Sequence, residues 1–171
     1  MTQVNTEANV IPLLEAAKAG NLKEVAALVN GGVRVNTDDK HGKTALHIAA
    51  EKGNQDLVDL LLTLGADINV ETRYGVTPLH LAAEKGHDLV VDFLLVNGAL
   101  SSGKVYDGLN DGETALHIAA REGWEDVTFV LLSHGAQVNP KTTNGLTPMT
   151  VAMQNGNADL AAILRRHGGT S

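Results

Sequence analysis

The sequence contains no cysteine, and aromatic residues make up only 3% of its 171 residues. Without cysteine, the chain forms neither disulfide bonds nor thiolate metal sites, and it has no thiol for redox chemistry. With so few aromatic residues, the core has to be built from Ala, Leu, Ile and Val. This composition favours slim helices that pack closely over a pocket lined by large rings.

Basic residues are also scarce, because 13 Lys and Arg stand against 20 Asp and Glu and give a formal net charge of −7. Binding to phosphate groups depends on clustered Lys and Arg, so we expect neither nucleic acid nor an anionic membrane as a partner. The basic run from Arg165 to His167 is accounted for by the C-terminal end of a helix, where cations complement the helix dipole.

Long apolar runs are missing as well. No window approaches 18 consecutive apolar residues, so the sequence predicts no membrane-spanning helix. The first residues, MTQVNTEANV, have neither a basic start nor an apolar run and do not resemble a signal peptide. We expect a cytoplasmic protein that is a monomer by itself, with export left open for a mature fragment.

What the sequence has in abundance is repetition. The phrase TALHIAAEKGN at residues 44–54 returns as TPLHLAAEKGH from Thr77 and as TALHIAAREGW from Thr114. A catalytic motif normally occurs once, whereas a phrase that returns with a period near 33 residues indicates a stack of structural repeats. The glycines before each phrase are spaced by 33, 37 and 33 residues, at Gly42, Gly75, Gly112 and Gly145.

Each repeat is predicted to contain two short helices. In the second repeat, Leu46 to Ala50 form one apolar segment, and Leu57 to Leu62 form another with apolar residues at i, i+3 and i+4. Thr44 stands where a helix N-cap needs a side-chain oxygen, and Gly53 suits the left-handed conformation that ends a helix. The N-cap position is filled again by Thr77, Thr114 and Thr147, with proline following at Pro78 and Pro148.

The run TPLHLAAEKGHDLVVDFLLVNGA from Thr77, with GADIN at 65–69 and GAQVN at 135–139, resembles the ankyrin repeat. The match covers about residues 10–168 and is specific, because a phrase, a period and several glycine columns coincide. The resemblance implies an all-α fold, an ankyrin-repeat solenoid of helix-turn-helix units joined by β-hairpin-like loops. We predict a polar N-terminal tail at 1–8 and one domain at 9–171, with repeats at about 9–38, 39–71, 72–108, 109–141 and 142–171.

The first and last of these five repeats are predicted to act as caps. Glu15 and Glu24 stand where the inner repeats have apolar residues, and Arg165 replaces a leucine. These changes make the outer faces of the stack polar, as terminal repeats require. The histidine of the repeated phrase also changes, to Thr150.

Three histidines at equivalent positions, His47, His80 and His117, suggest a zinc site at first sight. Stacked repeats place equivalent residues about 10 Å apart, however, whereas zinc needs ligands at about 2 Å. The resemblance implies instead that these histidines form structural hydrogen bonds between loops. The acidic run at 107–113 lacks the ligand spacing of a calcium loop, and turn chemistry explains its composition.

Catalytic motifs are missing from the sequence, which contains no GxSxG, no phosphate-binding glycine loop and no HExxH. Neighbouring carboxylates such as Asp38 and Asp39 fall in predicted turns or at exposed helix starts, and nothing suggests the burial that general acid chemistry needs. We therefore predict that the protein is not an enzyme and uses no catalytic residue, no cofactor and no metal.

Some residues depart from the repeat pattern. Between Gly98 and Gly112 the chain has four more residues than in the matching intervals. The loop at 101–111, with Lys104 and Tyr106, is either a recognition finger or a tolerated insertion.

Trp124 and Phe129 stand at positions that are polar or small in the other repeats. Two interpretations stay open for them, because they either form an exposed patch or are half-buried under the inserted loop.

The resemblance implies that the chain binds another protein through its hairpin tips and the concave face of its helices. Because Tyr, Trp and Arg dominate interface energies, we expect the centre of this surface at Arg73, Tyr74, Arg121 and Trp124. The predicted contact residues are Lys40, His41, Lys43, Arg73, Tyr74, Val76, Lys104, Tyr106, Asn110, Glu113, Arg121, Trp124, Asn144 and Leu146.

Two alternative functions stay open. The chain could be an inhibitor or immunity-type protein that blocks the active site of a specific enzyme with its loop or groove. It could also be an engineered ankyrin binder, because its framework is regular. The uneven 37-residue interval and Phe129 favour a natural sequence, since designs idealise their loops.

Overall fold

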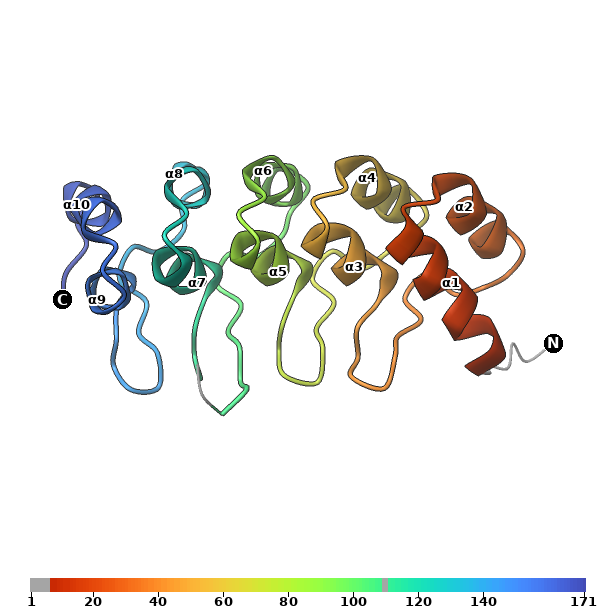
Figure 1. Ribbon diagram of the computed structural model, residues 1–171, viewed down its shortest axis with the longest axis horizontal. Helices are drawn as coiled ribbons and strands as arrows, with labels where there is room; N and C mark the ends of the chain where they lie inside the picture. Colours follow the sequence, from red (N-terminus) through yellow and green to blue (C-terminus); the bar gives the residue numbers. More distant parts are fainter. Residues whose placement is uncertain (1–6, 109–110) are drawn as a thin grey trace.

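A computed structural model describes residues 7–108 and 111–171 of the chain. These residues form ten α-helices in five pairs, which Figure 1 shows as one row from the N-terminal to the C-terminal repeat. The helices are α1 (Glu7–Ala19), α2 (Leu22–Asn30), α3 (Ala45–Glu51), α4 (Gln55–Thr63), α5 (Pro78–Glu84), α6 (Asp88–Val96), α7 (Ala115–Glu122), α8 (Glu125–Ser133), α9 (Pro148–Gln154) and α10 (Ala158–Arg166).

Each pair consists of an inner and an outer helix. The odd-numbered helices form the inner layer in Figure 1, the even-numbered helices lie above them, and the connecting hairpins extend below. Inner helices pack on neighbouring inner helices and outer helices on neighbouring outer helices. The predicted all-α solenoid of helix-turn-helix units is confirmed, because each repeat buries its apolar faces against the next.

The helix ends follow the residues that predicted them. Thr44, Thr77, Thr114 and Thr147 are the N-caps of α3, α5, α7 and α9. Proline opens α5 and α9, where the missing N–H is not needed by the helix. Helix α1 begins at Glu7 and so includes the last two residues of the predicted tail.

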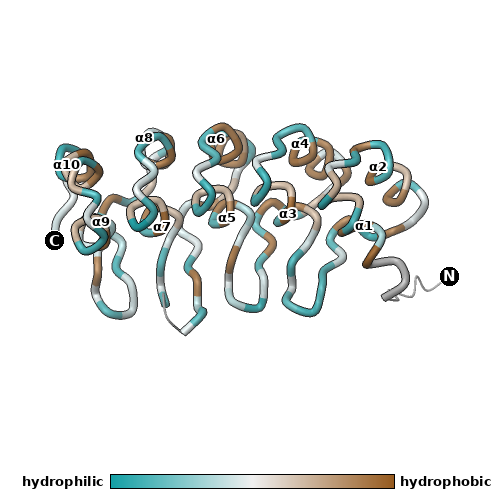
Figure 2. The backbone as a smooth tube through the Cα atoms, viewed as in Figure 1, coloured by the Kyte–Doolittle hydropathy of each residue, from teal (hydrophilic) through white to brown (hydrophobic). Residues whose placement is uncertain are grey.

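The core runs along the whole stack between the two helix layers. Pairs of fully buried alanines in the inner helices, such as Ala49 and Ala50, let neighbouring inner helices approach closely. Buried leucines such as Leu57 and Leu94 fill the space from the outer helices. Figure 2 shows the same division, because hydrophobic residues gather where helices face one another and the hairpins are largely hydrophilic.

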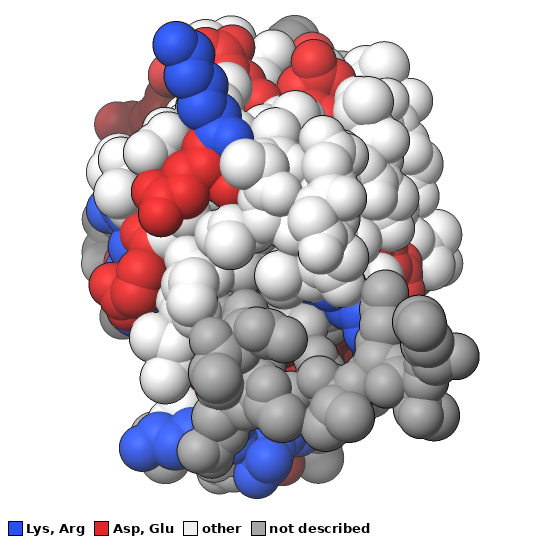
Figure 3. Space-filling model, turned by 90° about the vertical axis from the view of Figure 1, so that its right-hand side faces the viewer, with Lys and Arg blue, Asp and Glu red and all other residues white. Residues whose placement is uncertain are grey.

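The two end repeats carry the charges that the sequence predicted for caps. Glu15, Glu24 and Arg165 are all exposed. Figure 3 looks onto the N-terminal end of the stack, where charged side chains lie at the left, the top and the bottom of the view and much of the remaining described surface is uncharged. In the last repeat, Thr150 replaces the histidine, and its hydroxyl forms a hydrogen bond with that of Thr147.

Candidate functional site

The hairpins below the inner helices are built alike. Within three of the hairpins, a backbone N–H donates to the carbonyl four residues later, and a side-chain oxygen supports the turn. Asp39 Oδ1, for example, accepts from the N–H groups of His41 at 2.8 Å and Lys43 at 3.0 Å. These bonds fix each tip before any partner arrives. Backbone bonds of 2.9 to 3.0 Å join Asp39 to Lys43, Thr72 to Val76, and Thr142 to Leu146.

Neighbouring hairpin tips are also bonded to each other. The Arg73 N–H donates to the His41 carbonyl at 3.0 Å, and the Tyr106 N–H donates to the Tyr74 carbonyl at 2.8 Å. A third bond of 2.9 Å runs from the Thr143 N–H to the Asp111 carbonyl. The tips therefore form one continuous row, which we call the tip row.

The hairpin that leads into α7 is longer than the others, but it keeps this geometry up to Tyr106. Val105 takes the place that Thr72 and Thr142 hold in other hairpins, because its N–H donates to the Glu113 carbonyl at 2.9 Å. The four additional residues therefore fall at 107–110, a shorter insertion than the predicted loop at 101–111. Asp107 and Gly108 are exposed. Leu109 and the predicted contact residue Asn110 lie outside the described residues.

The two tyrosines of the chain lie on adjacent tips. Tyr74 is 51% exposed and Tyr106 is 59% exposed. The Tyr106 ring packs over Gly75, where a Cβ atom would lie only 3.1 Å from the ring and 2.6 Å from the Lys104 carbonyl oxygen. Gly75 has a φ angle of +71°, so the tip needs glycine both for its backbone conformation and for this close approach.

The predicted contact residues differ widely in their exposure. Eight of them are exposed to solvent, namely Lys40, His41, Arg73, Tyr74, Lys104, Tyr106, Trp124 and Asn144. Lys43, Val76, Arg121 and Leu146 are half-buried. Lys43 is also paired, because its Nζ lies 2.5 Å from Glu51 Oε2.

Glu113 is buried, with only 5% of its surface exposed. Its Oε2 atom lies 3.5 Å from Arg121 Nη2, so these two predicted contact residues contact each other. Burial raises the pKa of the Glu113 carboxyl above its usual value, and the nearby Arg121 guanidinium works against that rise. Little of Glu113 is left for a partner to touch.

Trp124 links two repeats. Its Nε1–H donates to the Glu84 carbonyl at 3.0 Å, and its ring lies 2.7 Å from where a Cβ on Gly86 would be. His87 makes the equivalent bond to the Glu51 carbonyl, also at 3.0 Å. The indole is therefore packed on the preceding repeat, with 41% of the residue exposed, rather than under the inserted loop, which was one of the two interpretations left open.

The position of Trp124 separates it from the tip row. It lies in the turn that follows α7, whereas Tyr74 lies in the hairpin that leads into α5. The two residues thus flank opposite ends of neighbouring inner helices, and the structure does not gather the predicted centre into one patch. Phe129 lies elsewhere again, 62% exposed on the outer helix α8.

The three repeated histidines form the structural hydrogen bonds that the resemblance implied. In His47, Nδ1 accepts from the Thr44 N–H at 3.2 Å, and Nε2 bonds to the Val76 carbonyl in the next hairpin at 2.9 Å. His80 and His117 bond in the same way to the carbonyls of Gly103 and Leu146, each at 3.0 Å. Burial lowers the pKa of all three, that of His80 to about 4.

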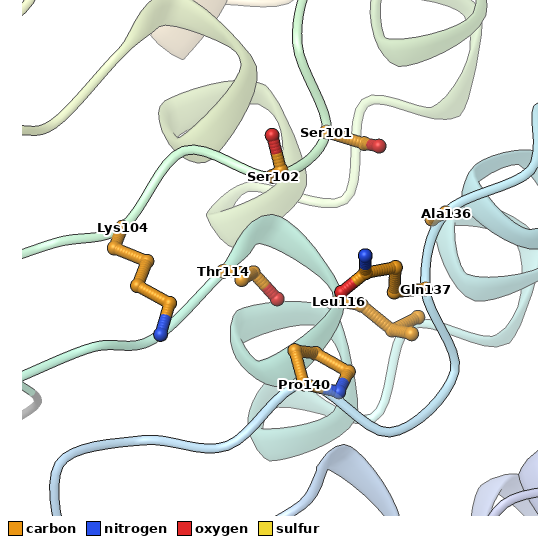
Figure 4. A pocket seen from close by; sticks show the side chains of 8 residues that line it. All are labelled: Ser101, Ser102, Lys104, Thr114, Leu116, Ala136, Gln137 and Pro140. Carbon is orange, nitrogen blue, oxygen red and sulfur yellow. The ribbon is translucent and has the colours of Figure 1, made fainter.

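A pocket lies beside the base of the inserted loop, next to the following repeat (Figure 4). Its one charged side chain is Lys104, whose Nζ donates to the Lys141 carbonyl at 3.2 Å. The lining includes no carboxylate that could act together with a nucleophile or a base. It is formed by Ser101, Ser102, Lys104, Thr114, Leu116, Ala136, Gln137 and Pro140.

Metal sites and membrane-spanning helices are both lacking among residues 7–108 and 111–171. No group of three or more His, Cys, Asp or Glu side chains in these residues is placed to hold a metal ion. No helix within the same residues is long and apolar enough to cross a membrane.

Comparison with known proteins agrees with the geometry. A family model for ankyrin repeats (3 copies) matches residues 2–72 and 79–170. No curated protein matches the sequence. The match covers nearly the whole chain, and the helix pairs, the bonded hairpins and the histidine bonds between loops recur from repeat to repeat. The chain belongs to the family of ankyrin-repeat proteins, whose repeats generally serve as protein–protein interaction modules.

Proposed function

We propose that the chain binds another protein, without catalysing a reaction, through the tip row and the adjoining face of the inner helices. The observation that carries this proposal is the placement of the two tyrosines. Both are exposed on adjacent tips, and a backbone hydrogen bond of 2.8 Å holds them together. Tyrosine supplies a large, rigid contact area at a low cost in conformational entropy, which suits it to the centre of an interface.

The order of the tip row supports the same role. Bonds within and between hairpins hold His41, Arg73 and Tyr106 in place before binding. A preformed surface loses little conformational entropy when it docks, so more of the contact energy appears as affinity. Arg73 adjoins Tyr74 and adds a planar, charged group of a kind often found at interface centres.

The C-terminal ends of the inner helices add polar contacts of both signs. Glu84 and Lys85 at the end of α5 pair at 2.8 Å, and Arg121 at the end of α7 approaches Glu122 at 3.6 Å. Charges that are already paired contribute little net attraction, so we assign them to the polar rim of the interface.

Capture from a lysate of the source cells tests the proposal. The bait would be the wild-type chain, the variant Tyr74→Ser/Tyr106→Ser, or the matched control Gln55→Ala/Thr63→Ala on the exposed side of α4. We expect one stoichiometric protein on the wild type and the control, with an affinity about a hundredfold weaker for the tyrosine variant. Equal affinity for all three baits would contradict the role of the tip row.

Inhibition of an enzyme is a second candidate, favoured by the insertion at 107–110. These residues are additional to the tip row, and Asp107 and Gly108 are exposed. A loop longer than its neighbours can enter an active site that the shorter tips cannot. If the captured protein is an enzyme, deleting residues 107–110 should abolish its inhibition. Full inhibition by the shortened chain would rule out this mechanism.

A further inference from the structure

The outer helices α6 and α8 expose apolar side chains where the neighbouring repeats expose polar ones. Leu89 and Val96 on α6 are 69% and 68% exposed, and Phe129 on α8 is 62% exposed. The equivalent positions hold Asp56 and Thr63 on α4, and Asp59 and Asp92 on α4 and α6. The three apolar residues therefore break a pattern that α4 keeps at all three positions on its outward side.

These side chains are additional to the core. Helix α6 already buries Val90, Val91 and Leu94 against the stack. Leu89 and Val96 are seven residues apart, two helical turns, so they lie on one outward face of α6. A helix that is apolar on its solvent side as well as on its core side indicates an interaction surface.

The same face is strongly acidic. Helices α4, α6 and α8 each contain two acidic residues and no Lys or Arg. Acidic residues in a first helical turn complement the helix dipole, which explains Asp56, Asp88, Glu125 and Asp126. Asp59 and Asp92 lie further along their helices, where the dipole gives no such reason, and Asp92 Oδ1 also lies 2.7 Å from His134 Nε2.

We propose that the outward face of α6 and α8 is a second docking surface, which binds a protein segment with apolar and basic side chains in the form of a cationic amphipathic helix. Apolar residues of the segment would cover Leu89, Val96 and Phe129, and its Lys and Arg would face the surrounding carboxylates. A second copy of the chain would bring two acidic faces together, and nucleic acid or an anionic membrane would be repelled. The outer helices lie on the side of the stack away from the hairpins, so this surface is independent of the tip row (Figure 1).

A labelled peptide of about 18 residues, built from Leu and Lys with Leu at i, i+3 and i+4, provides the probe, since it forms about five helical turns. Fluorescence anisotropy at low salt measures its affinity. The decisive variant is Leu89→Asp/Phe129→Asp, which copies residues from equivalent positions of other repeats and so keeps the fold, as circular dichroism would verify. It removes the apolar contact but adds two negative charges.

The proposal predicts that this variant binds the peptide at least about tenfold more weakly than the wild type, despite its added charge. Asp59→Asn/Asp126→Asn should weaken binding severalfold, and raised salt should weaken binding to the wild type. Unchanged or tighter binding by the aspartate variant would mean that charge alone attracts the peptide. The role of the apolar side chains in the proposal would then be wrong. Failure of the wild type to bind the peptide would overturn the proposal as well.

Two controls separate this surface from the other possibilities. The variant Tyr74→Ser/Tyr106→Ser should bind the peptide as the wild type does, and a loss there would move the site to the tip row. Sedimentation of the chain alone tests for a second copy as the occupant. If the wild type dimerises and Leu89→Asp/Phe129→Asp does not, a second copy of this chain occupies the surface in place of the proposed segment.

Discussion

Each repeated histidine is held in one protonation state by its surroundings. Thr44 N–H donates to Nδ1 of His47, and the Thr44 hydroxyl lies 3.0 Å from the same nitrogen. Because Nδ1 accepts, Nε2 must carry the proton, which it donates to the Val76 carbonyl. A second proton on Nδ1 would face a backbone N–H. The neutral ring is therefore required for the bond that Nδ1 accepts from the Thr44 N–H.

Stability should accordingly fall as the pH drops from about 6.5 towards 4. Burial lowers the pKa of His80 to about 4 in the folded chain, so the unfolded chain binds more protons in this window. With a pKa near 6.5 in the unfolded chain, the shift of His80 corresponds to about 3 kcal/mol in the free energy of unfolding, of which about 2 kcal/mol is lost by pH 5. Urea unfolding at pH 7 and pH 5 measures the loss.

The variant His80→Gln assigns this loss to one residue. It should be less stable than the wild type at pH 7 but should lose about 2 kcal/mol less between pH 7 and pH 5. The exposed histidine variant His41→Gln serves as the control and should keep the full pH dependence. An unchanged pH dependence in His80→Gln would show that the buried ring is not responsible.

Trp124 is a second residue whose main contact is to another repeat. Replacing it by alanine should cost about 1 to 2 kcal/mol, because the bond to the Glu84 carbonyl and the packing on Gly86 are both lost. Trp124→His copies His87, which makes the equivalent bond, and should lose less. Urea unfolding compares the two variants, and equal stability of Trp124→Ala and wild type would contradict the linking role.

At the scale of the hairpins, the insertion should be separable from the fold. Tyr106 bonds to the tip before it, and the Asp111 carbonyl bonds to the tip after it, so both contacts lie outside 107–110. Deleting 107–110 restores a 33-residue interval and should change the free energy of unfolding by less than about 1 kcal/mol, since loop length has a small entropic cost. A larger loss in urea unfolding would mean that the inserted residues support the stack.

The helices and their ends were predictable from the sequence because their causes are local. Threonine N-caps, prolines in the first turn and glycines at left-handed positions act within a few residues of themselves. The bonds of His47, His80 and His117 were anticipated only through the family resemblance, since their acceptors lie in the following hairpin.

The parts of the site that the sequence did not predict depend on how repeats meet. The docking of Trp124 on Gly86 joins two different repeats, and the burial of Glu113 runs against the usual exposure of charged residues. The exposed Leu89 and Val96 were missed for another reason, because they continue an apolar helix pattern. An alignment of the repeats places Asp56 and Thr63 at the equivalent positions. This comparison would have identified Leu89 and Val96 from the sequence.

The whole molecule holds together by contacts between neighbouring repeats, so we predict that its end repeats control self-association. Helix α7 packs on α9, and α8 packs on α10. Removing residues 142–171 should expose the apolar faces of α7 and α8 and deprive His117 of the Leu146 carbonyl. We expect a loss of about 3 kcal/mol, at roughly 0.1 kcal/mol per residue, together with self-association in sedimentation velocity experiments.

Copying the last repeat onto the fourth tests whether capping residues, rather than length alone, prevent this association. His117→Thr and Leu132→Arg reproduce Thr150 and Arg165 at equivalent positions. In the truncated chain they should restore a monomer, because a hydroxyl replaces an imidazole that has lost its acceptor and a charge replaces an uncovered leucine. The truncated chain with Thr63→Arg carries the same added charge at an exposed position of α4, and it should still self-associate. If it became monomeric too, net charge and not the end face would control association.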